Sequence, residues 1–249
     1  MKKRTLMTAA AISLLGLSSM AMADIQKLSD YQCLHADGNF NLNWQTGAPK
    51  IAITKNADSS KITISEDDGC LVIKEEKQRF WDTSGNKAID IDLSSSTLNE
   101  IVLDGRTNYH FSPIFSEHFN FKELGHGTGI FSSITTKSAD FRIMGHEDLN
   151  VSGLFADRAI IKINGRSIGT ITGKVSNLSI SNFGKSQLDL TELSTQNSSI
   201  YNLGQTDLSL DVNRLIRIDN MGISNINYYG APKVIKKNMG KLLLQPAGL

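Results

Sequence analysis

The sequence predicts an all-β protein, a right-handed parallel β-helix (β-solenoid) with coils of about twenty residues. Three observations support this fold class. Glycines recur every 18 to 20 residues, the residues around them alternate apolar and polar as in strands, and no interval carries a helical pattern. We expect a glycine at one corner of each coil, and these positions are Gly85, Gly105, Gly125, Gly145, Gly165, Gly184, Gly204, Gly222 and Gly240.

Residues 1–23 have the composition of a secretory signal peptide. A basic start at Lys2 to Arg4 is followed by an apolar stretch, and Ala21 and Ala23 supply a small-x-small cleavage motif before Asp24. The apolar stretch is shorter than the roughly 20 residues that a bilayer core requires. We therefore expect cleavage and export, to the periplasm or the extracellular surface of a Gram-negative bacterium, with no transmembrane segment left in the mature chain.

Residues 24–80 lack the glycine spacing and are expected to form an N-terminal β cap. Strand patterns at 40–44, 50–54, 61–65 and 70–75 are separated by turn-forming residues. The segment contains both cysteines, Cys33 and Cys70. In an oxidising compartment a disulfide between them is favoured over two free thiols, and it would stabilise the fold by about 3 to 4 kcal/mol.

Residues 81–249 are expected to form the solenoid repeats and, from residue 241, a C-terminal cap. The positions four residues before the glycines are Trp81, Ile101, Phe121, Phe141, Ile161, Ile180, Ile200, Ile218 and Lys236. All but the last are apolar, and a second apolar column follows each glycine by six residues. Each coil therefore has two short strands joined at a corner, where glycine would tolerate a positive φ.

A column of asparagines lies two residues before the later glycines. Earlier coils have Leu103, Ile143 and Ile163 at the same position. Like amides stacked on successive strands can bond to one another, which favours an asparagine ladder over four separately solvated turn residues. Its members are Asn182, Asn202, Asn220 and Asn238.

The chain resembles the head GIN domain family, which is associated with auto-transporter adhesins. The resemblance rests on the segment from Asn39 to Lys74 and above all on residues 226–240, which contain Tyr-Tyr-Gly-Ala-Pro-Lys-Val followed by Asn-Met-Gly. It extends over about residues 39–245. The resemblance implies a β-helical surface or periplasmic protein with an adhesive role and no catalytic residues, and it supplies no site to transfer. The chain departs from the family's serine-rich turns, with Asn-Phe-Gly-Lys and similar turns instead.

No residue constellation makes a convincing catalytic or metal site. Asp90, Asp92 and the corner residue Asp104 could serve a glycosidase, but alternating acids along a strand are what a solvated face contains. His126 and His146 should stack one coil apart, without a third ligand for a metal. We therefore expect no catalytic, cofactor or metal residues.

Two functional hypotheses remain. The first is a non-catalytic, adhesin-like or envelope-associated binding module that contacts surface glycans or envelope or host proteins. The alternative is a polysaccharide-active β-helix enzyme, a lyase or glycosidase. Without the leader the chain has 23 basic and 25 acidic residues, and a net charge near zero argues against nucleic acid as a partner. A monomer is expected.

Overall fold

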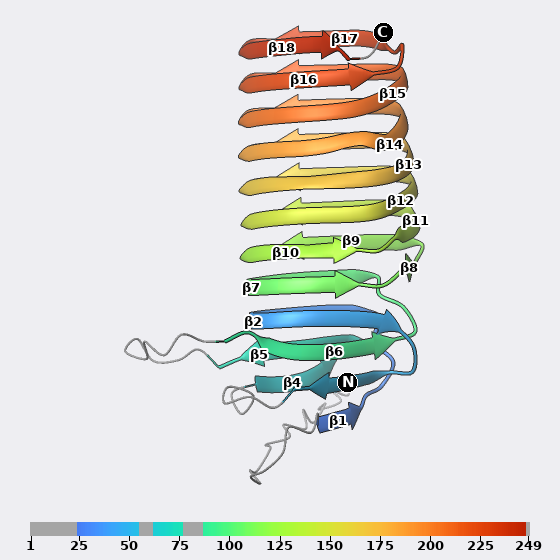
Figure 1. Cartoon of the computed structure of the whole chain (residues 1–249), viewed down its shortest axis with the longest axis vertical. Coiled ribbons are helices and arrows are strands. Elements are labelled where there is room, and N and C mark those ends of the chain that lie inside the picture. The colour runs from blue at the N-terminus through green and yellow to red at the C-terminus, as the bar shows by residue number, and fades with distance from the viewer. Residues whose placement is uncertain (1–23, 55–61, 77–86, 248–249) are drawn as a thin grey trace, which may run out of the picture.

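The computed structural model describes residues 24–54, 62–76 and 87–247, and the predicted leader, Trp81 and Gly85 lie outside them. Within these residues the protein is a right-handed stack of β coils without a helix (Figure 1), as predicted. No helix there is long and apolar enough to cross a membrane. The strands are β1 (Asp24–Lys27), β2 (Cys33–Thr46), β3 (Lys50–Ile53), β4 (Ile62–Asp67), β5 (Cys70–Glu75), β6 (Ile89–Ser95), β7 (Glu100–Phe111), β8 (Ile114–Phe115), β9 (His118–Glu123), β10 (His126–Phe131), β11 (Ile134–Ile143), β12 (His146–Ile163), β13 (Arg166–Asn182), β14 (Lys185–Asn202), β15 (Gln205–Asn220), β16 (Ile223–Tyr229), β17 (Lys233–Asn238) and β18 (Lys241–Pro246).

Parallel pairing holds each coil to the next in register. His126 pairs with His146, and His146 pairs with Arg166, so each residue lies over its counterpart about twenty positions away. The shorter later repeats are accommodated by register shifts between β12 and β13 and between β14 and β15, at positions away from the glycine corner. The corner therefore keeps its alignment along the stack.

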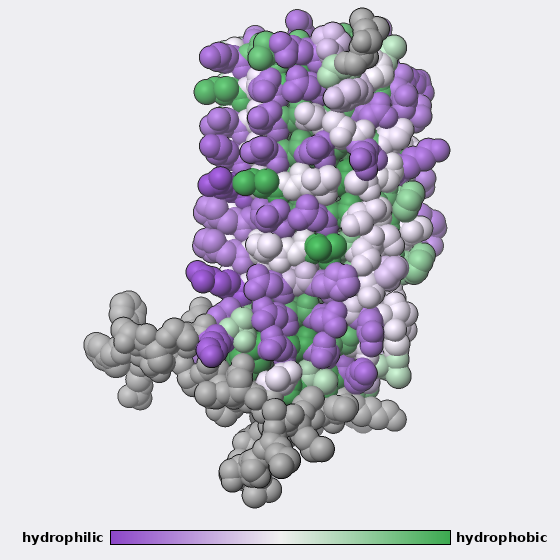
Figure 2. Space-filling model, viewed as in Figure 1, coloured by the Kyte–Doolittle hydropathy of each residue, from purple (hydrophilic) through white to green (hydrophobic). Residues whose placement is uncertain are grey.

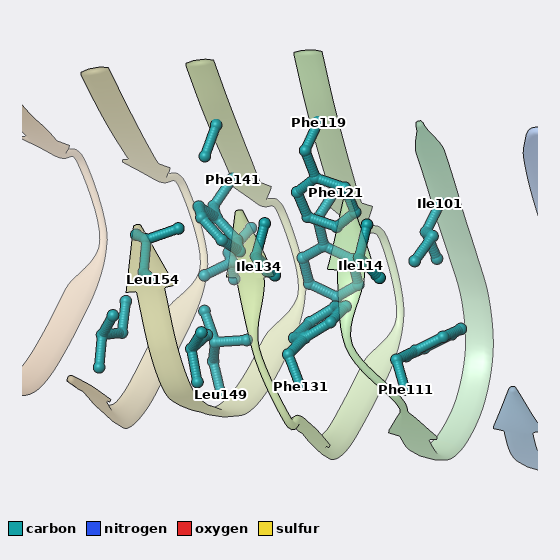
Figure 3. Close-up of a cluster of buried hydrophobic side chains, with 14 of the residues drawn as sticks. Ile101, Phe111, Ile114, Phe119, Phe121, Phe131, Ile134, Phe141, Leu149 and Leu154 are labelled. Carbon is teal, nitrogen blue, oxygen red and sulfur yellow. The ribbon is translucent and has the colours of Figure 1, made fainter. Parts of the chain in front are cut away.

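The interior is apolar and closely filled. The apolar residues four positions before the corner glycines are buried from Ile101 to Ile218, whereas Lys236 is exposed. Phenylalanines fill the middle coils (Figure 3): the rings of Phe111 and Phe131 stack with centroids 5.2 Å apart, and Phe119 meets Phe131 edge-on at 5.7 Å. Each buried side chain of this size stabilises the fold by about 1.5 to 3 kcal/mol.

Close packing between coils, rather than the expected positive φ, explains most corner glycines. Among the predicted corner glycines with described coordinates, only Gly105 has a positive φ, at 97°. A Cβ atom on Gly145 would instead lie 1.9 Å from the carbonyl oxygen of Gly125, and the same contact recurs from Gly165 to Gly240. That oxygen accepts a hydrogen bond from the His146 amide at 2.8 Å, so the coils cannot separate to admit a methyl group.

The asparagine column bonds as a ladder. The Nδ2 atom of Asn182 donates to Asn202 Oδ1 at 2.8 Å, Asn202 donates to Asn220 at 3.0 Å, and Asn220 donates to Asn238 at 2.7 Å. Each amide also donates to the carbonyl of the glycine two residues later. The first three asparagines are buried, and the ladder replaces the aliphatic packing of the earlier coils.

The N-terminal segment differs from a simple cap. β2 lies between β6 and β7, with Cys33 paired to both Cys70 and Glu100, so this early strand is a full layer of the solenoid (Figure 1). Gly38 pairs with Gly105 and occupies the corner position. β6 follows in the same register, with Ile89 paired to Phe40.

The strands that cover this end are antiparallel. β3 pairs with β6, β1 with β3, and β4 with β5. The Cys33–Cys70 disulfide links β2 to β5, and its two cysteines are 37 residues apart in the sequence. At the other end, β18 pairs with β16 in the solenoid register, so residues 241–246 continue the stack.

Candidate functional site

A groove lies on the outer face formed by β2, β6, β7 and β10. It has a volume of about 540 Å³. We call it the ladder groove, because rows of polar side chains cross it from coil to coil. Its lining residues are Asn41, Leu42, Asn43, Asp90, Ile91, Asp92, Asn108, Tyr109, His110, Thr128, Gly129, Ile130 and Asn150.

Two hydrogen-bonded rows run through this groove. In the first, Asn108 Nδ2 donates to Asn41 Oδ1 at 2.8 Å, and Asn41 Nδ2 donates to Asp90 Oδ1 at 2.6 Å. In the second, Asn43 Nδ2 donates to Asp92 Oδ1 at 2.9 Å. The rows exist because strand alternation turns these positions outward and parallel register aligns them.

The second row continues through His110. Its Nδ1 atom lies 3.4 Å from Asn43 Oδ1, and its Nε2 atom lies 3.2 Å from Ser132 Oγ. Neighbouring side chains thus hold one another in place, so the groove presents amide and carboxylate groups in a fixed order. This surface can bind hydroxyl-rich ligands with little loss of side-chain entropy.

The predicted acids do not form a glycosidase pair. Asp90 and Asp92 are alternate residues of one strand, both exposed, and each accepts a hydrogen bond from an asparagine. Asp104 is outside the groove, where its Oδ1 atom accepts the Gly105 amide at 2.8 Å. Glycosidase acids face one another across the scissile bond, and these three do not.

The histidine stack is present, but its geometry does not suit a shared metal ion. The rings of His126 and His146 are parallel within 5°, with centroids 4.8 Å apart. Ring-nitrogen lone pairs lie in the ring planes, so two parallel rings cannot both point at one ion between them. Cys33, His35 and Cys70 are also close together, but both sulfur atoms are in the disulfide.

Sequence reasoning missed a buried acidic pair next to this region. Glu123 is fully buried and Glu147 is 4% exposed. A Cβ atom on Gly127 would lie 2.0 Å from Glu147 Oε2 and 2.7 Å from Glu123 Oε2, so both carboxyl groups fill the space that this glycine leaves. Glu123 occupies the column that holds Leu103 and Ile143 in the neighbouring coils. An acid in this otherwise apolar column was the sequence feature that could have revealed the pair.

The pair has few hydrogen-bond partners. Tyr109 donates its hydroxyl hydrogen to Glu147 Oε1, and the Gly125 amide donates to Glu123 Oε1 at 2.8 Å. The Oε2 atoms of both acids have no partner among the described residues. Burial, followed by the nearby Glu147, raises the pKa of Glu123 to about 8, and burial raises the pKa of Glu147 to about 7. Burial and Glu147 also raise the pKa of Tyr109.

Known proteins resemble the chain at the level of family and fold. The family model described as "Putative auto-transporter adhesin, head GIN domain" matches residues 30–232. None of the curated proteins matches the chain.

Among solved structures, a "putative adhesin" from Parabacteroides distasonis has a TM-score of 0.76 at 17% identity, over 91% of this chain and 96% of its own. A "putative adhesin" from Parabacteroides merdae has a TM-score of 0.75 at 16% identity, with the same coverage of both chains. A "putative lipid binding protein" from P. distasonis has a TM-score of 0.73 at 14% identity, again over 91% and 96%.

Proposed function

Since the chain belongs to the head GIN domain family, we propose that it is an exported, non-catalytic binding module of the adhesin type, which holds glycan chains in the ladder groove. One observation carries the proposal: the two hydrogen-bonded rows of outward side chains in a groove of about 540 Å³. Such rows offer rigid donors and acceptors at the coil spacing of about 4.8 Å, and a linear polymer of hydroxylated units can engage several of them at once.

The groove suits binding better than the enzymatic alternative. Asp90 and Asp92 are engaged with Asn41 and Asn43 on one flat face. No carboxyl group of the described residues stands opposite them across the groove. A lipid ligand is a weaker candidate, because apolar side chains, phenylalanines among them, fill the interior of the solenoid and leave no room there for an acyl chain.

Export forms part of the proposal. The leader-like residues 1–23 and the adhesin description of the family support it. Fractionation of the producing cells, with N-terminal sequencing of the protein, should find a chain that begins at Asp24 in the periplasm, the envelope or the medium. An intact N-terminus in the cytoplasm would contradict this part.

Glycan-array binding followed by affinity measurement tests the groove. Asn108→Ala removes an outward amide from the first row, and Asn120→Ala removes an exposed amide from the other face as a matched control. We expect Asn108→Ala to weaken binding about 2- to 10-fold, the range for one lost hydrogen bond, and Asn120→Ala to leave it unchanged. Equal effects of the two variants, or no glycan bound by the wild type, would overturn the proposal.

A further inference from the structure

A row of basic side chains follows the glycine corner on the outside of the solenoid. Each member is the residue directly after a corner glycine, and each pairs in register with the next coil. All five are exposed, and the hydrophilic column at the left edge of Figure 2 follows this corner. We call it the corner stripe: Arg106, His126, His146, Arg166 and Lys185.

The cations of this stripe are not neutralised by partners. Within the part of the chain that the structure describes, Arg106, Arg166 and Lys185 form no ion pair. A comparable basic column on the opposite face, Lys122, Arg142 and Lys162, is interrupted by the ion pair between Arg142 and Asp140 at 2.8 Å. Arg166 and Lys185 are paired on neighbouring strands, where like charges repel one another and the fixed register prevents them from separating. A bound anion would relieve this repulsion.

The stripe borders a groove of about 360 Å³, the corner groove. Four of the five stripe residues line it, together with Asn108 and Thr128. Asn108 and Thr128 also line the ladder groove, so the two grooves adjoin each other. A polymer in the ladder groove can therefore reach the stripe through neutral, hydrogen-bonding side chains of the kind that contact sugars.

Acidic residues near the corner reduce the positive field only in part. Asp148 lines the corner groove and Asp104 precedes Gly105. Glu147 lies beneath Gly127, where burial raises its pKa to about 7 and thereby favours the protonated, neutral form. The three permanent cations of the stripe therefore exceed the two acids beside it, the exposed Asp148 and the partly buried Asp104.

We infer that the corner stripe binds the acidic groups of a polysaccharide, so that the solenoid prefers glycans carrying sulfate, phosphate or carboxylate groups at intervals. This inference rests on the proposed glycan binding and specifies its ligand class. Arginine forms paired hydrogen bonds with such oxyanions, and the two stacked histidines between Arg106 and Arg166 can add donors. The adjoining amide and hydroxyl groups favour a sugar polymer over nucleic acid.

Dextran sulfate and unmodified dextran of equal length test the charge preference by calorimetry. The stripe variant is R106Q/R166Q/K185Q, and the control variant K122Q/R142Q/K162Q removes the same charge from the opposite face. We expect the wild type to bind dextran sulfate with an affinity that falls as salt rises. The stripe variant should lose at least 10-fold in affinity, and the control variant no more than 2-fold.

Equal losses in the two variants would overturn the inference, since they would show attraction by general charge alone. Tighter binding of single-stranded DNA or of anionic phosphatidylserine vesicles than of dextran sulfate would also overturn it. Binding of neutral glycans with no gain for dextran sulfate would refute this inference alone. No glycan binding of either kind would refute the proposed function as well.

Discussion

The buried pair of Glu123 and Glu147 should make the protein less stable as pH rises. Their pKa values in the folded protein, about 8 and about 7, exceed the ordinary value of 4.5. The folded state therefore retains protons that the unfolded state releases. The resulting stabilisation is fully present below about pH 4.5 and is lost as pH rises through about 7 and 8.

Glu147→Gln isolates the share of one carboxyl group. For Glu147 the difference between 4.5 and about 7 corresponds to about 3 kcal/mol, since one pKa unit is worth about 1.4 kcal/mol. Between pH 5 and pH 9 the wild type should lose about 3 kcal/mol more of its free energy of unfolding than the variant does. The glutamine keeps the shape of the side chain and can still accept the Tyr109 hydroxyl.

Urea unfolding at a series of pH values gives the comparison, because titrating groups away from the pair are common to both proteins and cancel. Glu123 does not cancel: without the Glu147 charge its pKa is raised less, so its own loss of stability is smaller in the variant and adds to the difference. Glu192→Gln, at an exposed position, is the matched control and should follow the wild-type curve. Parallel pH curves for the wild type and Glu147→Gln would refute the reasoning, since the buried acid would then hold no excess proton in the folded state.

Other predictions concern the interior and the corner. Asn202→Ala should lower the free energy of unfolding by about 2 to 3 kcal/mol, because it leaves buried amide groups without hydrogen-bond partners. In the same urea titration, Asn238→Ala at the exposed end of the ladder should lower it by less than about 1 kcal/mol. Gly145→Ala should lower the melting temperature sharply, because its Cβ would lie 1.9 Å from a carbonyl oxygen, while Gly47→Ala, with its nearest neighbour at 3.6 Å, should be tolerated. Reduction of the disulfide should cost about 4 kcal/mol, measured by urea unfolding with and without reductant.

The repeat could be predicted from the sequence because the physical requirement at each position is the same in every coil. Apolar residues before the glycines, such as Ile161 and Ile180, had to be buried, and they are. The corner glycines could also be predicted, but the physical reason for glycine at these positions could not. Sequence cannot distinguish a positive φ from a close approach between neighbouring backbones, and only the coordinates show the carbonyl of the coil below.

The position of β2 could not be read in the same way. Spacing arguments assume that coils stack in chain order, and Gly38 is 67 residues before its partner Gly105. Glu123 and Glu147 were missed for another reason. Glu123 interrupts a column that is apolar in neighbouring coils, but Glu147 looks like an ordinary surface acid until the register shows that its column points inward and that Gly127 leaves room beside it.

The placement of β2 between two later strands sets an order of assembly. From β10 onward, each coil can form on the one before it, as in other solenoids. β2 instead needs β6 and β7, which follow it by about fifty residues or more, so closing this layer carries the entropy of long loops. The disulfide to β5 shortens one of these loops. We therefore expect the N-terminal layers to be the slow, non-local step of folding, and the remaining coils to extend from the template that they provide.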